Sequence, residues 1–261
     1  MTNLTDETPI LETRGLTKHY GGVHALTEAN FTLGRHEHVA IMGDNGAGKS
    51  TFVRQITGVE LPTLGQIVFD GTAQSFQSPI EAREAGIETV FQTLALADDL
   101  DVPANLFLGR EKIRFNLGPF SILDKKAMRE ATLAALVKTG VKIPNLMNTI
   151  RNMSGGQRQC VAIARTAAFK SKLVIMDEPT AALGVQETAQ VENIIRTLKE
   201  AGEPLILVSH NMRQVFDLVD RIVVFRRGRI VANLRKDETD GQDVVAYITG
   251  AKTGLDYEGA A

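Results

Sequence analysis

Gly43-Asp44-Asn45-Gly46-Ala47-Gly48-Lys49-Ser50 is the stretch that decides the fold of this chain. It matches the P-loop pattern G-x-x-x-x-G-K-[ST] at every fixed position. In such a loop the glycines let backbone N–H groups converge on an anion, the lysine reaches the outer phosphates, and the hydroxyl ligates Mg²⁺. The stretch therefore predicts a site for the phosphates of a nucleotide, with Lys49 and Ser50 as its reactive side chains.

The segments on either side of the loop have the periodicity that this motif requires. His38-Val39-Ala40-Ile41-Met42 is a short apolar run, typical of a buried strand. After the loop, Thr51 to Ile56 has apolar residues at 52, 53 and 56, as expected for a helix with one buried face. Because strand, loop and helix follow in the required order, a phosphate-binding loop explains the stretch better than a glycine-rich turn without a function.

The composition is that of an ordinary globular protein. The chain has 261 residues, of which 43% are hydrophobic and 23% charged. This length is sufficient for one α/β domain with an additional subdomain, or for two small domains. A net charge of −2 gives no basic field of the kind that favours nucleic acid, so no nucleic-acid partner is expected. No secretory signal and no membrane-spanning run is found, and a lone Cys160 fits a reducing compartment. A cytoplasmic location is expected.

The residues before the loop predict an antiparallel β layer. Residues 1–9 are mostly polar and predict a disordered tail. Ile10 to Tyr20 has β character, Gly21-Gly22 turns the chain, and two more short β segments follow up to Leu33. The chain from 10 to 250 is interpreted as one domain, with 251–261 as a flexible tail.

Beyond the loop, the pattern changes from strands to helix. Gly65 to Gly71 predicts a strand with a tight Asp-Gly turn, Pro79 opens a helix, and Ile87 to Gln92 predicts another strand. From Val102 to Lys138 the pattern is helical, with apolar residues at near-helical spacing. These are Met128, Leu133, Leu136 and Val137. We therefore expect an α-helical subdomain inserted at about residues 93–168.

A second candidate anion site lies at Met153-Ser154-Gly155-Gly156-Gln157, before an apolar helix from Cys160 to Phe169. Two glycines after a serine at a helix start leave N–H groups and the positive end of the helix dipole facing outward. An N-capping serine with glycines used only for the turn is the alternative reading. Cys160 itself is expected to be a buried, unreactive side chain.

Two later apolar runs end in chemically active residues. Leu173-Val174-Ile175-Met176 predicts a central parallel strand, and Asp177-Glu178 follows it at the edge where α/β sheets bind ligands. Asp177 is expected to help hold Mg²⁺, with Glu178 nearer the γ-phosphate. Leu205 to Val208 predicts a second such strand, followed by Ser209-His210. Residues 221–233 then predict a β-hairpin with a basic, solvated tip.

Together these segments resemble the nucleotide-binding subunits of ABC transporters, from about Ile10 to Gly250. The P-loop alone is shared by many NTPases. Met153 to Gln157 narrows the resemblance, since it is similar to the ABC signature Leu-Ser-Gly-Gly-Gln with Met in place of Leu. The fold class expected is α/β: a P-loop NTPase core with a mixed central sheet, an N-terminal antiparallel β layer and an inserted α-helical subdomain.

The resemblance implies a role for each matching residue, with ATP as the nucleotide and Mg²⁺ as its metal. Tyr20 would stack on adenine, and Gln92 would contact Mg²⁺ and the attacking water. Glu178 would be the general base, and His210 would contact the γ-phosphate. The expected metal ligands are Ser50, Gln92 and Asp177. The other expected nucleotide contacts are Gly43, Asp44, Asn45, Gly46, Ala47, Gly48, Lys49, Thr51, Ser154, Gly155, Gly156 and Gln157.

Two stretches are similar to the subgroup that powers carbohydrate import in bacteria, closest to the fructose or ribose type. They are VFQTLALADDLDVPANLFLGRE (90–111) and EPTAALG (178–184). Many members of that subgroup carry two fused ATPase domains, whereas this sequence has one. Gly184 departs from the pattern, because most of the family has an aspartate at this position of the D-loop. The implied location is the cytoplasmic face of the inner membrane.

The order of the motifs implies a two-chain mechanism. The signature helix lies at the end of the insert, far from the P-loop of the same chain, so a second chain, head to tail, would bring Ser154 and Gly155 onto the γ-phosphate. The expected partners are thus a second copy, a membrane permease and, indirectly, a periplasmic sugar-binding protein. The alternatives are an ABC ATPase of a different transporter or a regulator of translation or DNA repair. A GTPase is disfavoured, since no Asn-Lys-x-Asp motif occurs.

Overall fold

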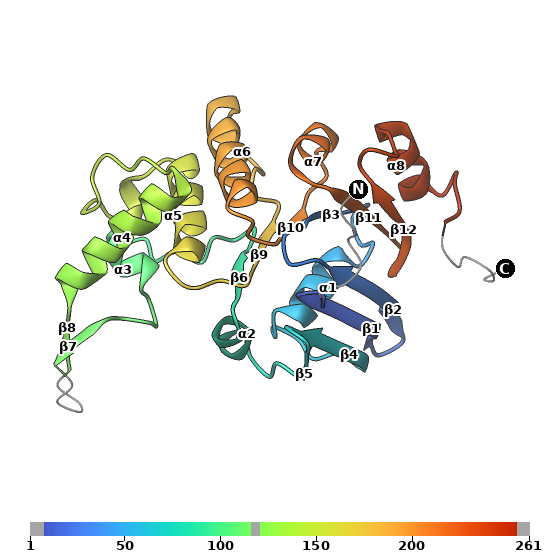
Figure 1. Cartoon of the computed structure of the whole chain (residues 1–261), viewed down its shortest axis with the longest axis horizontal. Helices are drawn as coiled ribbons and strands as arrows, with labels where there is room; N and C mark the ends of the chain where they lie inside the picture. The colour runs from blue at the N-terminus through green and yellow to red at the C-terminus, as the bar shows by residue number, and fades with distance from the viewer. Residues whose placement is uncertain (1–7, 116–120, 255–261) are drawn as a thin grey trace. The chain divides into compact units, whose positions relative to one another are not determined.

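The computed structural model describes residues 8–115 and 121–254. The predicted tails, 1–9 and 251–261, lie for the most part outside these residues. The chain divides into two compact units. Figure 1 labels the helices and strands that belong to them. The first comprises residues up to 89, 172–178 and 199 onward, and the second comprises 90–171 and 179–198.

The first unit contains two sheets. The four-stranded sheet has the order β2-β1-β4-β5, and its strands pair antiparallel, which confirms the predicted N-terminal β layer. Its strands are β1 (Leu11–Tyr20), β2 (Val23–Leu33), β4 (Leu64–Phe69) and β5 (Thr72–Gln74). Between β4 and β5, Asp70 and Gly71 both have positive φ, at 50° and 76°, so the predicted Asp-Gly turn is confirmed.

The second sheet is mixed and has the strand order β12-β11-β3-β10-β9-β6. Its strands β11, β3, β10 and β9 run parallel, and β12 is antiparallel to β11, which confirms the mixed central sheet. The strands are β3 (His38–Gly43), β6 (Ile87–Val90), β9 (Leu173–Asp177), β10 (Leu205–Val208), β11 (Arg221–Arg226) and β12 (Arg229–Arg235). The residues of β9 from 173 to 176 and all of β10 are buried, as their continuous apolar runs indicated.

Helix α1 (Lys49–Ile56) lies between these two sheets (Figure 1). Its Phe52 ring packs 5.3 Å from the ring of Phe31 in β2 and 5.4 Å from that of Phe225 in β11. The three rings adopt tilted or edge-to-face arrangements, which aromatic pairs prefer. The helix that follows the P-loop is therefore anchored to both sheets. The other helices of this unit are α2 (Pro79–Ala85), α7 (Met212–Leu218) and α8 (Gly241–Thr249).

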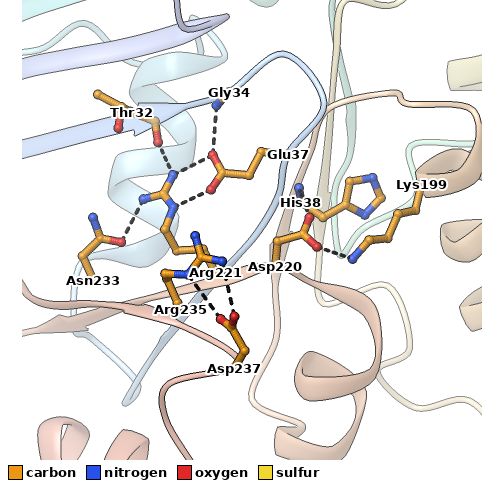
Figure 2. A network of polar contacts seen from close by, with 10 residues as sticks. All are labelled: Thr32, Gly34, Glu37, His38, Lys199, Asp220, Arg221, Asn233, Arg235 and Asp237. Carbon is orange, nitrogen blue, oxygen red and sulfur yellow. Dashed lines mark hydrogen bonds and ion pairs between the residues drawn. The ribbon is translucent and has the colours of Figure 1, made fainter. Parts of the chain in front are cut away.

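A polar network links the four-stranded sheet to the mixed sheet around Arg221 (Figure 2). The guanidinium of Arg221 in β11 donates to both carboxylate oxygens of Glu37, at 2.6 and 2.9 Å, and to the carbonyl of Thr32 in β2 at 2.6 Å. Beside it, Asp220 accepts from the ammonium of Lys199 at 2.6 Å and from the backbone N–H of His38 at 3.0 Å. The bidentate Arg221–Glu37 pair combines charge with a fixed geometry, so it holds the residue before β3 beside the start of β11.

The second unit is mainly helical. Its helices are α3 (Val102–Leu106), α4 (Lys125–Thr139), the 3₁₀ turn η2 (Ile150–Asn152), α5 (Gly155–Ala167) and the greater part of α6 (Val185–Glu200). The segment predicted as an insert, about 93–168, falls within this unit, together with residues 179–198, which the sequence had not associated with it. In the part of the chain that the structure describes, no helix has the length and apolar character needed to cross a bilayer.

The prediction of a helical pattern throughout Val102–Lys138 was wrong in its middle. Strands β7 (Ile113–Phe115) and β8 (Ile122–Leu123) pair antiparallel there. β-Branched and aromatic residues two apart favour a strand, and the next helix begins only where the Asp124 carboxylate accepts from the N–H of Ala127 at 2.9 Å. Of the four apolar residues that suggested the pattern, Met128 and Leu136 are buried, whereas Leu133 and Val137 are 47% and 81% exposed.

Cys160 lies inside α5 and is buried, as predicted. Burial raises the pKa of its thiol to about 11, and the negative charge of Glu187 adds to this effect. The reactive thiolate form is therefore scarce at neutral pH.

Candidate functional site

The P-loop connects the end of β3 to the start of α1, so the predicted order of strand, loop and helix is confirmed. The ammonium of Lys49 donates to the carbonyl of Gly43 at 2.7 Å and to that of Asp44 at 2.9 Å. Packing explains two of the loop glycines. A Cβ on Gly43 would lie 2.3 Å from the carbonyl oxygen of Phe225, and one on Gly48 would lie 2.8 Å from that of Ala25. Both glycines also have positive φ, which other residues rarely adopt.

The turn between β11 and β12 holds the P-loop in place. The backbone N–H of Gly228 donates to the carbonyl of Ala47 at 2.9 Å, and the carbonyl of Gly228 accepts from the N–H of Thr27 at 2.7 Å. The sequence identified this turn only as a basic, solvated tip. Arg227 and Arg229 are indeed exposed, but Gly228 between them is buried. No side-chain pattern signals the contact, since backbone atoms make it.

The two carboxylates predicted for this site lie at the end of β9. Asp177 is the last residue of the strand, and Glu178 follows with a φ of +51°. The N–H of Glu178 donates to the carbonyl of Val208 in β10 at 2.9 Å, which fixes the backbone at this bend. The Nδ1 atom of His210 lies 2.9 Å from the Oε1 atom of Glu178. The structure thus brings together two residues that are 32 positions apart and that the resemblance assigned to the same reaction.

Asp177 and Glu178 interact electrostatically with Lys49 of the P-loop. Burial lowers the pKa of Lys49, and the negative charges of Glu178 and Asp177 oppose that shift. Burial likewise raises the pKa of Asp177, with a further rise from the charge of Glu178 and a compensating effect from Lys49. The three side chains therefore lie near enough to affect one another's charge. Such coupled shifts are typical of sites that handle charged substrates.

Tyr20 lies at the end of β1, before the turn into β2, and 44% of its surface is exposed. Its hydroxyl donates to the carboxylate of Glu60, and the ammonium of Lys18 lies 5.3 Å from the ring centroid. The hydroxyl contact orients the ring on the surface. Stacking of adenine on this ring stays a prediction from the resemblance.

The signature segment begins α5 with a capping box. The Ser154 hydroxyl accepts from the N–H of Gln157 at 3.2 Å, and the Gln157 side chain accepts from the N–H of Ser154 at 3.0 Å. Ser154 is therefore an N-cap, as the alternative interpretation held. The capping box leaves the N–H groups of Gly155 and Gly156 outside its two bonds. Gly155 is exposed, and a Cβ there would have only Leu183 nearby, at 3.9 Å, so this end of the helix is compatible with an anion.

Gln92 and Gly184 also belong to the second unit. Strand β6 ends at Val90, so exposed Gln92 comes two residues after the strand rather than at its end. Gly184 directly precedes α6. The contacts expected of Gln92 and of the signature residues with nucleotide rest on the resemblance.

A protein-family model matches this chain. The model described as ABC transporter matches residues 26–181, a range that contains the P-loop, the signature segment and the carboxylates at the end of β9.

Several sugar-import proteins are similar over most of this chain. It is 47% identical to the fructose import ATP-binding protein FrcA of Rhizobium meliloti, over 94% of this chain and 95% of that protein. It is 40% identical to the xylose/arabinose import ATP-binding protein XylG of Sulfolobus acidocaldarius, over 94% and 96%. The ribose import ATP-binding protein RbsA 2 of Streptomyces avermitilis is 34% identical, and there the chain spans 48% of the relative's length.

Solved structures from two ABC transporters have the same fold. An MJ1267 structure, an ATP-binding cassette of an ABC transporter, is 26% identical, with a TM-score of 0.79 over 92% of this chain and 99% of that one. The structure of cbiO1 from Clostridium perfringens, part of the ABC transporter complex cbiONQ, is 27% identical, with a TM-score of 0.75 over 94% and 96%. The predicted fold class is confirmed.

Proposed function

Because the chain belongs to the ABC transporter family, whose ATP-binding chains hydrolyse ATP to drive transport, we propose that it energises import of a fructose-like or ribose-like monosaccharide through a separate permease. The family and the ATP-hydrolysing activity predicted from the sequence are thereby confirmed. The choice of sugar is supported by the names of the fructose, xylose/arabinose and ribose import proteins that the chain resembles.

The observation that carries the chemistry is the contact between Glu178 and His210. In the proposed reaction Glu178 accepts a proton from the attacking water, and His210, 2.9 Å from its carboxylate, orients that base and contacts the γ-phosphate. Lys49 supplies positive charge to the phosphates from the P-loop. A positioned carboxylate, a lysine and a ring of backbone N–H groups are the parts that phosphoryl transfer needs, because most of its catalysis is positioning and charge stabilisation.

Magnesium fits the oxygen donors of the first unit. The hydroxyl of Ser50 in the first turn of α1 and the carboxylate of Asp177 are the ligand types that Mg²⁺ prefers. The raised pKa of Asp177 reflects burial beside the negative Glu178, a cost that a divalent cation would offset. When bound, the ion would neutralise charge on the phosphates. The resemblance adds Gln92 as a third ligand.

The exposed signature segment supports a two-chain arrangement. Ser154 and Gly155 lie on the surface of the second unit, where a γ-phosphate held by a second copy of this chain could reach the free N–H groups. ATP would then hold two copies together, and hydrolysis would let them separate. The motion would pass to a membrane permease, which would place this chain at the cytoplasmic face of the membrane. A periplasmic sugar-binding protein would deliver the sugar to that permease.

A growth test addresses the proposed transport. A strain lacking this chain is expected to fail on one monosaccharide supplied at low concentration as the sole carbon source, and to recover with the wild-type chain but not with Glu178→Gln. Growth on fructose, ribose, xylose and arabinose unaffected by the deletion would contradict the proposed substrate class. In the purified transporter, ATP turnover should rise when the binding protein carries that same sugar.

A further inference from the structure

The side chain of Glu187, in the first turn of α6, lies against the D-loop position that departs from the family pattern. The N–H of Gly184 donates to the Oε2 atom of Glu187 at 2.9 Å. A Cβ on Gly184 would lie 2.7 Å from that same oxygen. The backbone of Gly184 is outside the left-handed region, so its conformation does not require glycine. The missing side chain at 184 therefore leaves room for the carboxylate of Glu187.

The same side chain packs on the second glycine of the signature. A Cβ on Gly156 would lie 2.2 Å from the Cγ atom and 2.7 Å from the Cβ atom of Glu187. The contact involves the stem of the glutamate, which cannot swing aside as its carboxylate could. Gly156 is buried, in contrast to exposed Gly155 beside it. Glu187 thus touches the loop before α6 with its carboxylate and the start of α5 with its stem.

Helix capping explains the pairing of Gly184 with Glu187. The carbonyl of Gly184 accepts the first helical bond of α6, from the N–H of Thr188 at 2.9 Å, which makes Gly184 the N-cap residue. A capping box has two halves: a side chain at the N-cap bonds the N3 backbone, and the N3 side chain bonds the N-cap backbone. Glycine at 184 cannot supply the first half. Glu187, at N3, supplies the second.

We propose that Glu187 is a positioning residue for ATP hydrolysis, which caps α6 from its N3 position where the N-cap glycine has no side chain to do so. This inference rests on the proposed function of the signature segment. Glu187 holds the loop that ends at Gly184 in a fixed position against Gly156. The N–H group of exposed Gly155 is then presented to the γ-phosphate in one geometry. A displacement of about 1 Å in such donors can cost up to about 100-fold in rate.

Turnover kinetics of the complete transporter test this role. Glu187→Ala should lower kcat about 10-fold and leave KM for ATP within about twofold, because the P-loop of the first unit is untouched. Glu187→Gln keeps the stem and an acceptor oxygen, so it should retain most of the wild-type kcat. Gln186→Ala, at an exposed neighbouring position, is the matched control and should be silent.

A swap variant separates positioning from general destabilisation. Gly184→Asp alone should lower kcat, since its new side chain meets the Glu187 carboxylate with like charge. In the Glu187→Ala background the same aspartate has room and can accept from the N–H of residue 187, so the double variant should regain at least half of the lost kcat. If each substitution only destabilised the protein, the effects of Gly184→Asp and Glu187→Ala would add, and the double variant would not regain activity. A double variant worse than both single variants overturns the proposal.

Hydrogen exchange measured without ATP gives a second readout on the full chain. Glu187→Ala should speed exchange of the Gly184 amide and of residues 154–158, and Glu187→Gln should not. Unchanged exchange in Glu187→Ala, or a kcat within twofold of wild type, overturns the proposal while leaving ATP hydrolysis by the wild-type chain intact. A wild-type transporter that hydrolyses no ATP would instead overturn the proposed function, and the positioning role with it.

Discussion

The Nδ1 atom of His210 lies 2.9 Å from the Oε1 atom of Glu178. The backbone of Glu178 is held as well, by the bond from its N–H to the carbonyl of Val208 and by its left-handed φ of +51°. The carboxylate is therefore fixed at both ends of its side chain, at the carboxyl end of a parallel strand. A general base needs this kind of restraint, because proton transfer depends on its distance from the attacking water.

Glu178→Gln should slow ATP hydrolysis by about 10²–10⁴, the range expected for a lost general base, and should leave ATP binding intact. Binding without hydrolysis should trap the two-chain state. Turnover, nucleotide affinity and gel filtration with ATP and Mg²⁺ measure these effects, with Glu200→Gln as an exposed control. A variant that turns over normally would remove Glu178 as the base, and one that stays monomeric with ATP would contradict the two-chain state.

Lys49→Ala should abolish nucleotide binding or hydrolysis, because the P-loop loses the cation that faces several phosphate charges. Its half-buried ammonium has a lowered pKa, and the carbonyls of Gly43 and Asp44 hold it in the loop. ATP binding measured by calorimetry and turnover in the transporter are the readouts. Lys142→Ala, at an exposed position of the second unit, should change neither. Wild-type activity in Lys49→Ala would refute the site.

Gly155→Asp should leave ATP bound to each chain but stop hydrolysis, since it adds bulk and negative charge at the exposed start of α5. A mixture with Lys49→Ala should regain part of the activity, because a mixed dimer has one composite site with both halves intact. Nucleotide affinity and turnover are measured separately. Normal turnover would show that the signature segment only starts a helix.

Gly228→Ala should weaken ATP binding about 10-fold or more, although this residue is not expected to touch the nucleotide. Its Cβ would lie 3.0 Å from the carbonyl of Ala25 and would disturb the bond that Gly228 donates to Ala47 in the P-loop. Gly140→Ala is the matched control, since Gly140 has a similar positive φ and open space around it. Both variants should lose about 1–2 kcal/mol of stability from the strained backbone. Equal ATP affinities would contradict the supporting role of the turn.

The free energy of unfolding should fall as the pH drops below about 6.5, the ordinary pKa of histidine. Burial lowers the pKa of His38 in the folded chain, with Lys199 adding to the effect and Asp220 opposing it. The unfolded chain therefore binds a proton in a range where folded His38 does not. Urea unfolding between pH 8 and pH 5 should show a smaller loss for His38→Gln than for the wild type. His24→Gln, at an exposed position, should match the wild type; equal curves for all three would contradict the assignment.

The sequence alone predicted those parts of the site that consist of residues adjacent in the chain. The P-loop, the apolar strand before it and the carboxylates at the end of β9 were all predictable, because each motif spans a few residues and lies beside a segment with clear periodicity. The parallel strands then bring Glu178 and His210 together, since both follow neighbouring strands at the same edge of one sheet. The helical pattern predicted over Val102–Lys138 was wrong at β7 and β8, because such short strands hold too few residues for a period of two to be distinguished from the helical period.

Only the tertiary structure decided what surrounds these motifs. The bond from Gly228 to Ala47 joins backbone atoms 181 positions apart, so no side-chain type could have indicated it. Gly156, Gly184 and Glu187 are individually unremarkable, and their relationship appears only when the starts of α5 and α6 are packed together. A motif depends on the chemistry of neighbouring residues, whereas steric fit between distant segments depends on the folded chain. The sequence therefore indicates the reactive groups but not the residues that hold them in place.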